Sequence, residues 1–157
     1  MCRKDFTSLA RKTIISVLVE GNQLTEKGKI YMKFKLYNFD RLTKEEVDFV
    51  NENGHGSLPK HEVSMRLGHG TSDRNRIEVL KMVGECFETG WFNHVANVTC
   101  DTFDDVFRLT NDPSVTEEEY NSCVERLLPM HSVSVGDVVE NESGEKFLCD
   151  RLGWTRV

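Results

Sequence analysis

The chain has 157 residues, of which 38% are hydrophobic and 29% are charged, and its net charge at pH 7 is −6. This composition is typical of a folded globular protein and excludes wholesale disorder. The negative charge argues against a generic basic nucleic-acid-binding protein, yet it is too small for a mimic of DNA. The charge is uneven, because residues 101–119 are acidic and residues 27–35 are basic.

No apolar run in the sequence approaches the roughly 20 residues that a membrane-spanning helix needs. The apolar run at residues 14–19 is only as long as a strand and is too short for a signal peptide. We therefore expect no membrane partner and a cytoplasmic location.

The spacing of cysteine and histidine argues against a metal site. The five cysteines include no CxxC pair, whereas zinc ribbons and disulfide frameworks need paired spacing. His55, His61 and His69 are six and eight residues apart, and zinc-binding histidines usually form closer pairs. We predict reduced, mostly buried thiols, with neither a metal nor a cofactor.

Two strands are predicted near the start of the chain. Residues 13–20 are β-branched and apolar, and residues 30–39 alternate between apolar and polar side chains, as in strands with one buried face. Turn residues lie between them, so the two segments are expected to pair as an antiparallel hairpin.

A helix-capping pattern follows these strands. Thr43 and Glu46 match the capping box, in which the hydroxyl accepts from the Glu46 N–H and the carboxylate reaches back. The pattern predicts a short helix to about residue 52, with Val47 and Val50 facing inward.

Residues 54–70 are the hardest to assign, since they contain four glycines, one proline and three histidines. A strand at residues 61–67 is one alternative. The longest helix is predicted to begin at residues 71–73 and to end at Gly90. The residues that recur at helical spacing and should face the core are Ile77, Leu80, Val83 and Phe87.

The C-terminal half alternates between both kinds of element. Residues 91–99 predict a strand, a helix opens at Thr102, and a second helix from Thr116 extends toward Pro129. Their predicted core residues are Phe103, Val106, Phe107, Tyr120, Cys123, Val124 and Leu127. The predicted strands that follow are residues 132–140, 146–150 and 152–157.

This order predicts an α+β fold of antiparallel β-hairpins with three to four helices and a C-terminal three-stranded β module. Residues 1–90 are expected to form an N-terminal α+β region with the hairpin and the long helix. Residues 91–157 are expected to form a C-terminal α+β module, and the two regions could also pack as one domain.

The C-terminal segment carries a motif, since residues 131–157 read HSVSVGDVVENESGEKFLCDRLGWTRV. The residues that match the motif are Ser132, Ser134, Val135, Gly136, Asp137, Val138, Gly144, Phe147, Gly153 and Trp154. Together with the strand–helix segment at residues 95–111, they resemble the YodL-like family of small proteins from phages, plasmids and conjugative elements. The family pattern has arginine at the position of His131.

The resemblance implies a mobile-element setting and no particular reaction. Together with the acidic balance it favours a non-enzymatic accessory protein that binds and modulates a host or phage protein, such as a nucleic-acid enzyme. The predicted docking surface combines an acidic helical face with an edge of the C-terminal module: Asp104, Asp105, Glu117, Glu118, His131, Trp154 and Arg156. Helix capping and solubility also account for such acidic residues.

The alternative function is single-stranded nucleic-acid binding. Four side chains should project from one side of a strand at intervals of about 7 Å: Tyr31, Lys33, Lys35 and Tyr37. Aromatic rings stack on bases and lysines meet phosphates, although an ordinary solvated sheet face has the same composition.

An enzyme is not expected. Cys86 and Cys100 flank His94 in the sequence, but a Cys–His nucleophile needs a third orienting group, for which the sequence offers no candidate. Nothing in the sequence predicts the oligomeric state.

Overall fold

The protein is described by a computed structural model that covers residues 23–24 and 30–157. Within these residues the chain forms five helices and one antiparallel sheet, so the predicted α+β class is confirmed, with one helix more than expected. The helices are α1 (Lys44–Asn53), α2 (Pro59–Gly68), α3 (Arg76–Glu88), α4 (Phe103–Asn111) and α5 (Glu117–Cys123). The strands are β1 (Gln23–Leu24), β2 (Ile30–Phe39), β3 (Phe92–Cys100), β4 (Val124–Arg126), β5 (Val138–Glu140), β6 (Lys146–Asp150) and β7 (Gly153–Arg156).

The long strand β2 lies in the middle of the sheet, whose order is β4-β3-β2-β5-β6-β7, with β1 paired to β2. The predicted C-terminal three-stranded unit is β5-β6-β7, and it continues the sheet directly from β2. The two regions expected from the sequence therefore share one sheet. The predicted strand at residues 13–20 lies outside the described residues.

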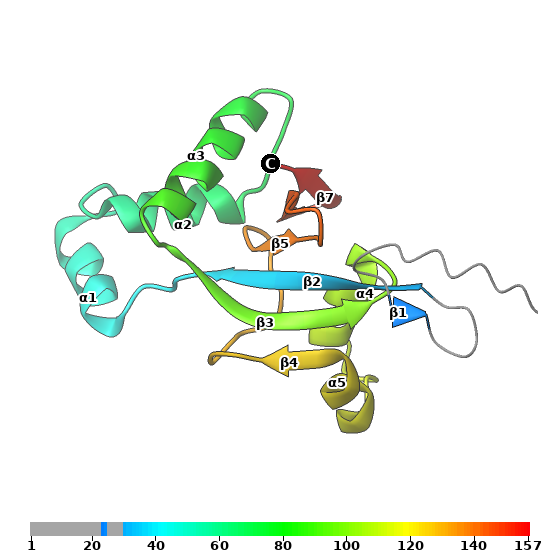
Figure 1. Ribbon diagram of the computed structural model, residues 1–157. Helices are drawn as coiled ribbons and strands as arrows, with labels where there is room; N and C mark the ends of the chain where they lie inside the picture. Colours follow the sequence, from blue (N-terminus) through cyan, green and yellow to red (C-terminus); the bar gives the residue numbers. More distant parts are fainter. Residues whose placement is uncertain (1–22, 25–29) are drawn as a thin grey trace, which may run out of the picture.

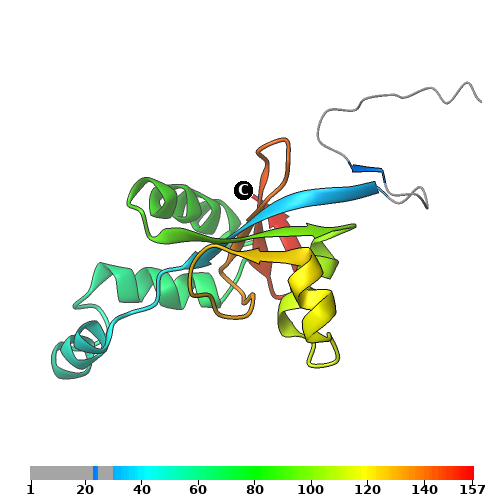
Figure 2. The same ribbon diagram turned by 60° about the horizontal axis from the view of Figure 1, so that its bottom comes forward.

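Helices cover both faces of this sheet (Figures 1 and 2). One core forms under α2 and α3, around Leu67 and Val83. The other forms under α4 and α5, around Phe34 and Val106. β2 contributes Phe39 to the first core and Phe34 to the second, whereas its Lys33 and Lys35 side chains are exposed.

A β-bulge shifts the register in the middle of the sheet. Leu36 pairs with Ala96, but the next residue, Tyr37, pairs with His94, so Val95 is the extra residue. A bulge lets two successive side chains turn to one face. Val95 and Ala96 accordingly both lie in the core under α4 and α5.

The predicted caps are present. Thr43 and Glu46 form the capping box of α1, Thr102 and Asp105 form that of α4, and the Thr116 hydroxyl accepts from the Glu119 N–H at α5. Short polar side chains at these positions satisfy the free N–H groups of a first helical turn.

The strand alternative for residues 61–67 is wrong, because this segment lies in α2. Pro59 is its first residue, where the fixed φ of proline suits a helix. Val63 and Leu67, one turn apart, both contact the core under α2 and α3. The inward stripe of α3 also differs from the prediction: Ile77 is 87% exposed, whereas Val79 and Met82 are buried.

The predicted helix through Leu127 is also wrong at its end. α5 ends at Cys123, and Val124 pairs with Val98 as the first residue of β4. On α1 and α4 the predicted inward residues Val47 and Phe107 are more than 40% exposed. The first predicted C-terminal strand shrinks to β5, and residues 127–137, here called the crossover segment, connect β4 to β5.

Among the described residues, no helix has the length and apolar character that a bilayer-spanning segment requires.

Candidate functional site

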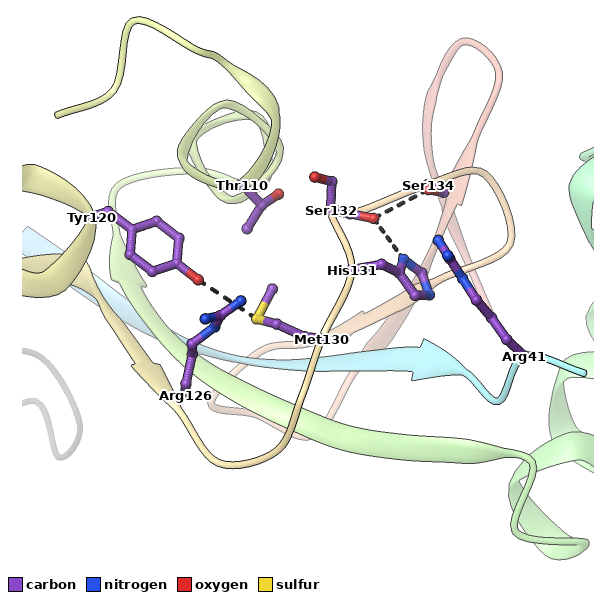
Figure 3. A pocket seen from close by; sticks show the side chains of 8 residues that line it. All are labelled: Arg41, Thr110, Tyr120, Arg126, Met130, His131, Ser132 and Ser134. Carbon is purple, nitrogen blue, oxygen red and sulfur yellow. Dashed lines mark hydrogen bonds between the residues drawn. The ribbon is translucent and has the colours of Figure 1, made fainter. Parts of the chain in front are cut away.

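A cavity of about 520 Å³ lies beside the crossover segment, between the ends of several elements. It is lined by Arg41, Thr110, Tyr120, Arg126, Met130, His131, Ser132 and Ser134 (Figure 3). Two guanidinium groups, an imidazole and four hydroxyl groups therefore border one cavity. Apart from the Met130 thioether, the side chains that line it are polar or amphipathic.

The fold brings these groups together from distant parts of the sequence. Arg41 follows β2, Thr110 lies in the last turn of α4, and Arg126 ends the edge strand β4, opposite Ala96. The crossover segment is tied to α4, because the Val133 N–H donates to the Thr110 hydroxyl over 3.4 Å. Burial of Val133 in the core fixes the middle of the segment.

The two arginines of this cavity lack anionic partners. Arg126 lies over the Tyr120 ring, with 5.9 Å from its guanidinium carbon to the ring centre. Neither the Arg126 nor the Arg41 guanidinium pairs with a carboxylate anywhere in the described part of the chain. Arg66 and Arg108, in contrast, each form ion pairs with two carboxylates.

His131 is held in one orientation by groups of the crossover segment. Its Nδ1 lies 2.7 Å from the Ser132 carbonyl oxygen and 3.7 Å from Asp137 Oδ2. Because a carbonyl oxygen only accepts, Nδ1 carries a proton and Nε2 is left for another partner.

The carboxylate of Asp137 connects the backbone segments that surround the cavity. It is buried and accepts hydrogen bonds from the Phe39 N–H at 3.0 Å and the Ser134 N–H at 2.8 Å. Burial raises its pKa to about 6, although His131 and the backbone donors act in the opposite direction. Asp137 thereby fastens the end of β2 to the turn before β5.

A second cavity, of about 490 Å³, shares Arg41, Met130 and His131 with the first. Its other walls include the apolar residues Phe39, Val95, Leu128 and Pro129, together with the polar residues Asn38, Asp40 and Asn93. A polar cavity and an apolar one therefore meet at the same three residues.

The predicted docking residues are distributed over separate places. Asp105 caps α4, and Asp104 accepts a hydrogen bond from the Trp154 indole N–H at 3.3 Å. Arg156 forms an ion pair of 2.6 Å with Glu145. Glu117 and Glu118 are exposed in the first turn of α5, and His131 lies in the polar cavity.

The predicted nucleic-acid face is partly engaged in contacts of its own. The Lys35 ammonium lies 2.7 Å from the Glu140 carboxylate. Tyr37 is half-buried, with its ring centre 5.2 Å from that of Phe87. Lys33 is exposed and Tyr31 is half-buried, so the four side chains do not form one open surface.

The prediction of buried thiols is confirmed for Cys86, Cys100 and Cys149, which are free and buried. Burial raises the pKa of Cys86 to about 11 and the pKa values of the other two to about 12. Cys123 is half-buried, and Cys2 lies outside the described residues. His94 contacts Asn97, with 2.9 Å between Nε2 and Oδ1.

Arg41 and Arg126 were absent from the residues predicted as sites. Each looks like an ordinary surface arginine in the sequence, and only the crossover places them at one cavity. Comparison of the chain with protein-family models, with curated proteins and with solved structures found no match.

Proposed function

We propose that the protein acts by binding a phosphorylated ligand in the polar cavity. The observation that carries this proposal is the presence of two guanidinium groups without carboxylate partners at one cavity, in a chain of net charge −6. Arginine forks match the oxygens of phosphate in two parallel hydrogen bonds. Arg74, Arg76 and Arg151 also form no ion pair among the described residues, so what favours an external anion is that two unpaired guanidinium groups border the same cavity.

The number of donors supports phosphate over a carboxylate. Besides Arg41, Arg126 and His131, the cavity has the Ser132 hydroxyl, whereas the Thr110 hydroxyl already donates to the Val106 carbonyl at 3.1 Å. A carboxylate has two oxygens to accept hydrogen bonds, whereas a phosphate monoester has three and carries nearly twice the charge.

Titration of the full chain with inorganic phosphate, followed by calorimetry, tests this proposal. We expect salt-sensitive binding that weakens by about tenfold or more in Arg126→Gln and in Arg41→Gln, because hydrogen bonds to charged groups contribute about 1.5–3 kcal/mol each. Arg74→Gln, an exposed arginine in the turn before α3, is the matched control and should bind like the wild type. Equal affinities in all four proteins would rule out the site.

A second candidate function is docking of an accessory protein on a host or phage protein, which the mobile-element setting of the YodL-like resemblance and the acidic balance together favour. The observation that favours it is that Glu117 and Glu118 are exposed at the start of α5, while Asp105 is used in a cap. Such unpaired carboxylates are available to a basic partner surface.

Charge reversal tests this second function. Glu117→Lys/Glu118→Lys should release a stoichiometric partner that the wild type retains from host lysate, because like charges then oppose each other. Glu52→Lys/Glu88→Lys changes the net charge equally at exposed positions of α1 and α3, and should keep the partner. Retention by both double variants would contradict docking through α5.

Single-stranded nucleic acid is the alternative ligand. Tyr31, Lys33, Lys35 and Tyr37 are its predicted contacts, and pairing of Lys35 with Glu140 reduces their free positive charge. A labelled single strand in place of phosphate in the same titration separates the two ligands. Binding lost in Tyr31→Ala/Tyr37→Ala but kept in Arg126→Gln would favour the strand face.

A further inference from the structure

The ligand site extends beyond what a phosphate group can fill. The polar and apolar cavities measure about 520 and 490 Å³ and share Arg41, Met130 and His131. Each volume alone lies within the roughly 300–1,000 Å³ of small-molecule sites. Inorganic phosphate would leave most of this space open to water.

The walls of the second cavity indicate what else the ligand contains. Val95, Leu128, Pro129 and Met130 give it an apolar lining, and Leu128 is 47% exposed. An exposed apolar side chain at the border of a charged site favours an apolar group of the ligand next to its anionic group.

The backbone of the crossover segment provides further hydrogen-bond donors. At one end, the N–H groups of Leu127 and Leu128 donate to the Val95 carbonyl at 2.8 and 3.1 Å, and at the other the Val133 N–H donates to Thr110. Between these ties, the N–H groups of Met130, His131 and Ser132 donate to no group in the described part of the chain. In an extended segment alternate N–H groups point to the same side, so the N–H groups of Met130 and Ser132 suit the carbonyl groups of another extended chain.

The charges around the two cavities favour an anionic partner. Arg41, Arg126 and His131 line them, and the one carboxylate at the rim of the apolar cavity, Asp40, already pairs with Lys60 at 2.6 Å. The Asp137 carboxylate is buried beneath His131.

We propose that the ligand is an extended segment of a partner protein in which a phosphorylated residue is followed by an apolar one. The phosphate binds between Arg41 and Arg126, the apolar side chain enters the cavity at Leu128, and the peptide backbone runs along Met130–Ser132. This proposal rests on the proposed phosphate binding and adds the class of macromolecule that carries the phosphate.

Fluorescence polarisation of the full chain with labelled heptapeptides tests the proposal. The peptides share a glycine–serine frame and contain phosphoserine–leucine, phosphoserine–glycine, serine–leucine or aspartate–leucine at the centre. We expect the phosphoserine–leucine peptide to bind about tenfold or more tightly than each of the others, since it alone fills both cavities.

Two leucine variants distinguish the contribution of the apolar cavity to peptide affinity from the general effect of removing an exposed leucine. Leu128→Ser should remove the advantage of leucine over glycine after phosphoserine and should leave the affinity for inorganic phosphate unchanged. Leu152→Ser, at a fully exposed leucine in the turn between β6 and β7, should leave both unchanged.

The outcomes distinguish failure of this proposal from failure of phosphate binding. Equal affinity for the two phosphoserine peptides, with inorganic phosphate still bound, would overturn the peptide proposal alone. The same holds if a 5′-phosphorylated single-stranded oligonucleotide binds as tightly as the phosphoserine–leucine peptide. If neither inorganic phosphate nor any peptide binds, both proposals fall.

Discussion

Asp137 occupies a position where burial and hydrogen bonding act against each other. Its carboxylate accepts two backbone N–H groups, and its carbonyl oxygen accepts the Cys149 N–H at 2.7 Å. Burial nevertheless dominates and raises the pKa to about 6, from the ordinary value of 3.8. The folded protein therefore binds the proton of Asp137 more tightly than the unfolded chain does.

This difference predicts how stability changes with pH. As pH rises from about 4 to about 7, Asp137 must ionise in a buried site, so the wild type should lose up to about 3 kcal/mol of unfolding free energy relative to Asp137→Asn. Urea unfolding of both proteins across this range measures the difference. The change with pH is decisive, because the asparagine also alters hydrogen bonds at every pH.

A second pair of proteins controls for general pH effects. Asp112 is fully exposed, and hydrogen bonds from Ser114 lower its pKa below 3.8. Its contribution is present above about pH 4 and is lost only below it, so wild type and Asp112→Asn should give parallel curves from pH 4 to pH 7. If the Asp137→Asn curve also runs parallel to that of the wild type, the raised pKa is wrong.

Local capping residues were predictable because their partners lie three residues away. Thr43 with Glu46, and Thr102 with the acidic residues of the next turn, follow from sequence spacing alone. Arg41 and Arg126 could not be recognised in this way, since the cavity that joins them exists only after the sheet has formed.

At the scale of elements, the turn before β5 is packed against α2. Gly136 has φ +101°, and a Cβ atom there would lie 3.1 Å from Leu67 Cβ. Its N–H donates to the Cys149 carbonyl at 3.0 Å, which ties the turn to β6. The glycine thus allows a helix and two strands to approach one another closely.

Gly136→Ala should lower the unfolding free energy by about 1–3 kcal/mol, because a side chain at positive φ is strained and this one also presses on Leu67. Gly144→Ala is the matched control: its φ is +80°, but a Cβ atom there would meet nothing within 4 Å. The loss should be smaller in this control, as measured by urea unfolding. Equal losses in the two variants would mean that α2 moves away from the new side chain without a measurable loss of unfolding free energy.

The elements that sequence patterns misassigned share a physical cause. Residues 61–67 lie in a glycine-rich part of the sequence where the helical spacing of apolar residues is hard to recognise. Val63 and Leu67 nevertheless pack into the core beneath α2. Val124 continues a helical pattern, but its pairing with Val98 extends the sheet and ends α5. In both cases tertiary contacts outweighed a weak local preference.

At the scale of the whole molecule, the α+β class followed from the mixture of periodicities, whereas the strand order did not. Hairpin neighbours such as β5 and β6 are close in sequence, so their pairing could be anticipated. The pairing of β2 with β5 leaves no periodic signal in the sequence. The side chains of these two distant strands would be equally compatible with several other strand orders.

The central position of β2 also affects how the chain reaches its final structure. Lys35 on β2 and its partner Glu140 on β5 are 105 residues apart. During synthesis from the N-terminus, residues 35–37 of β2 therefore have no β5 to pair with until the chain has grown by those 105 residues. Closure of such distant contacts is entropically costly and slow, and an unpaired apolar strand is a template for aggregation. The same strand that unites the two halves of the sheet is thus exposed to misassembly while the chain is being made.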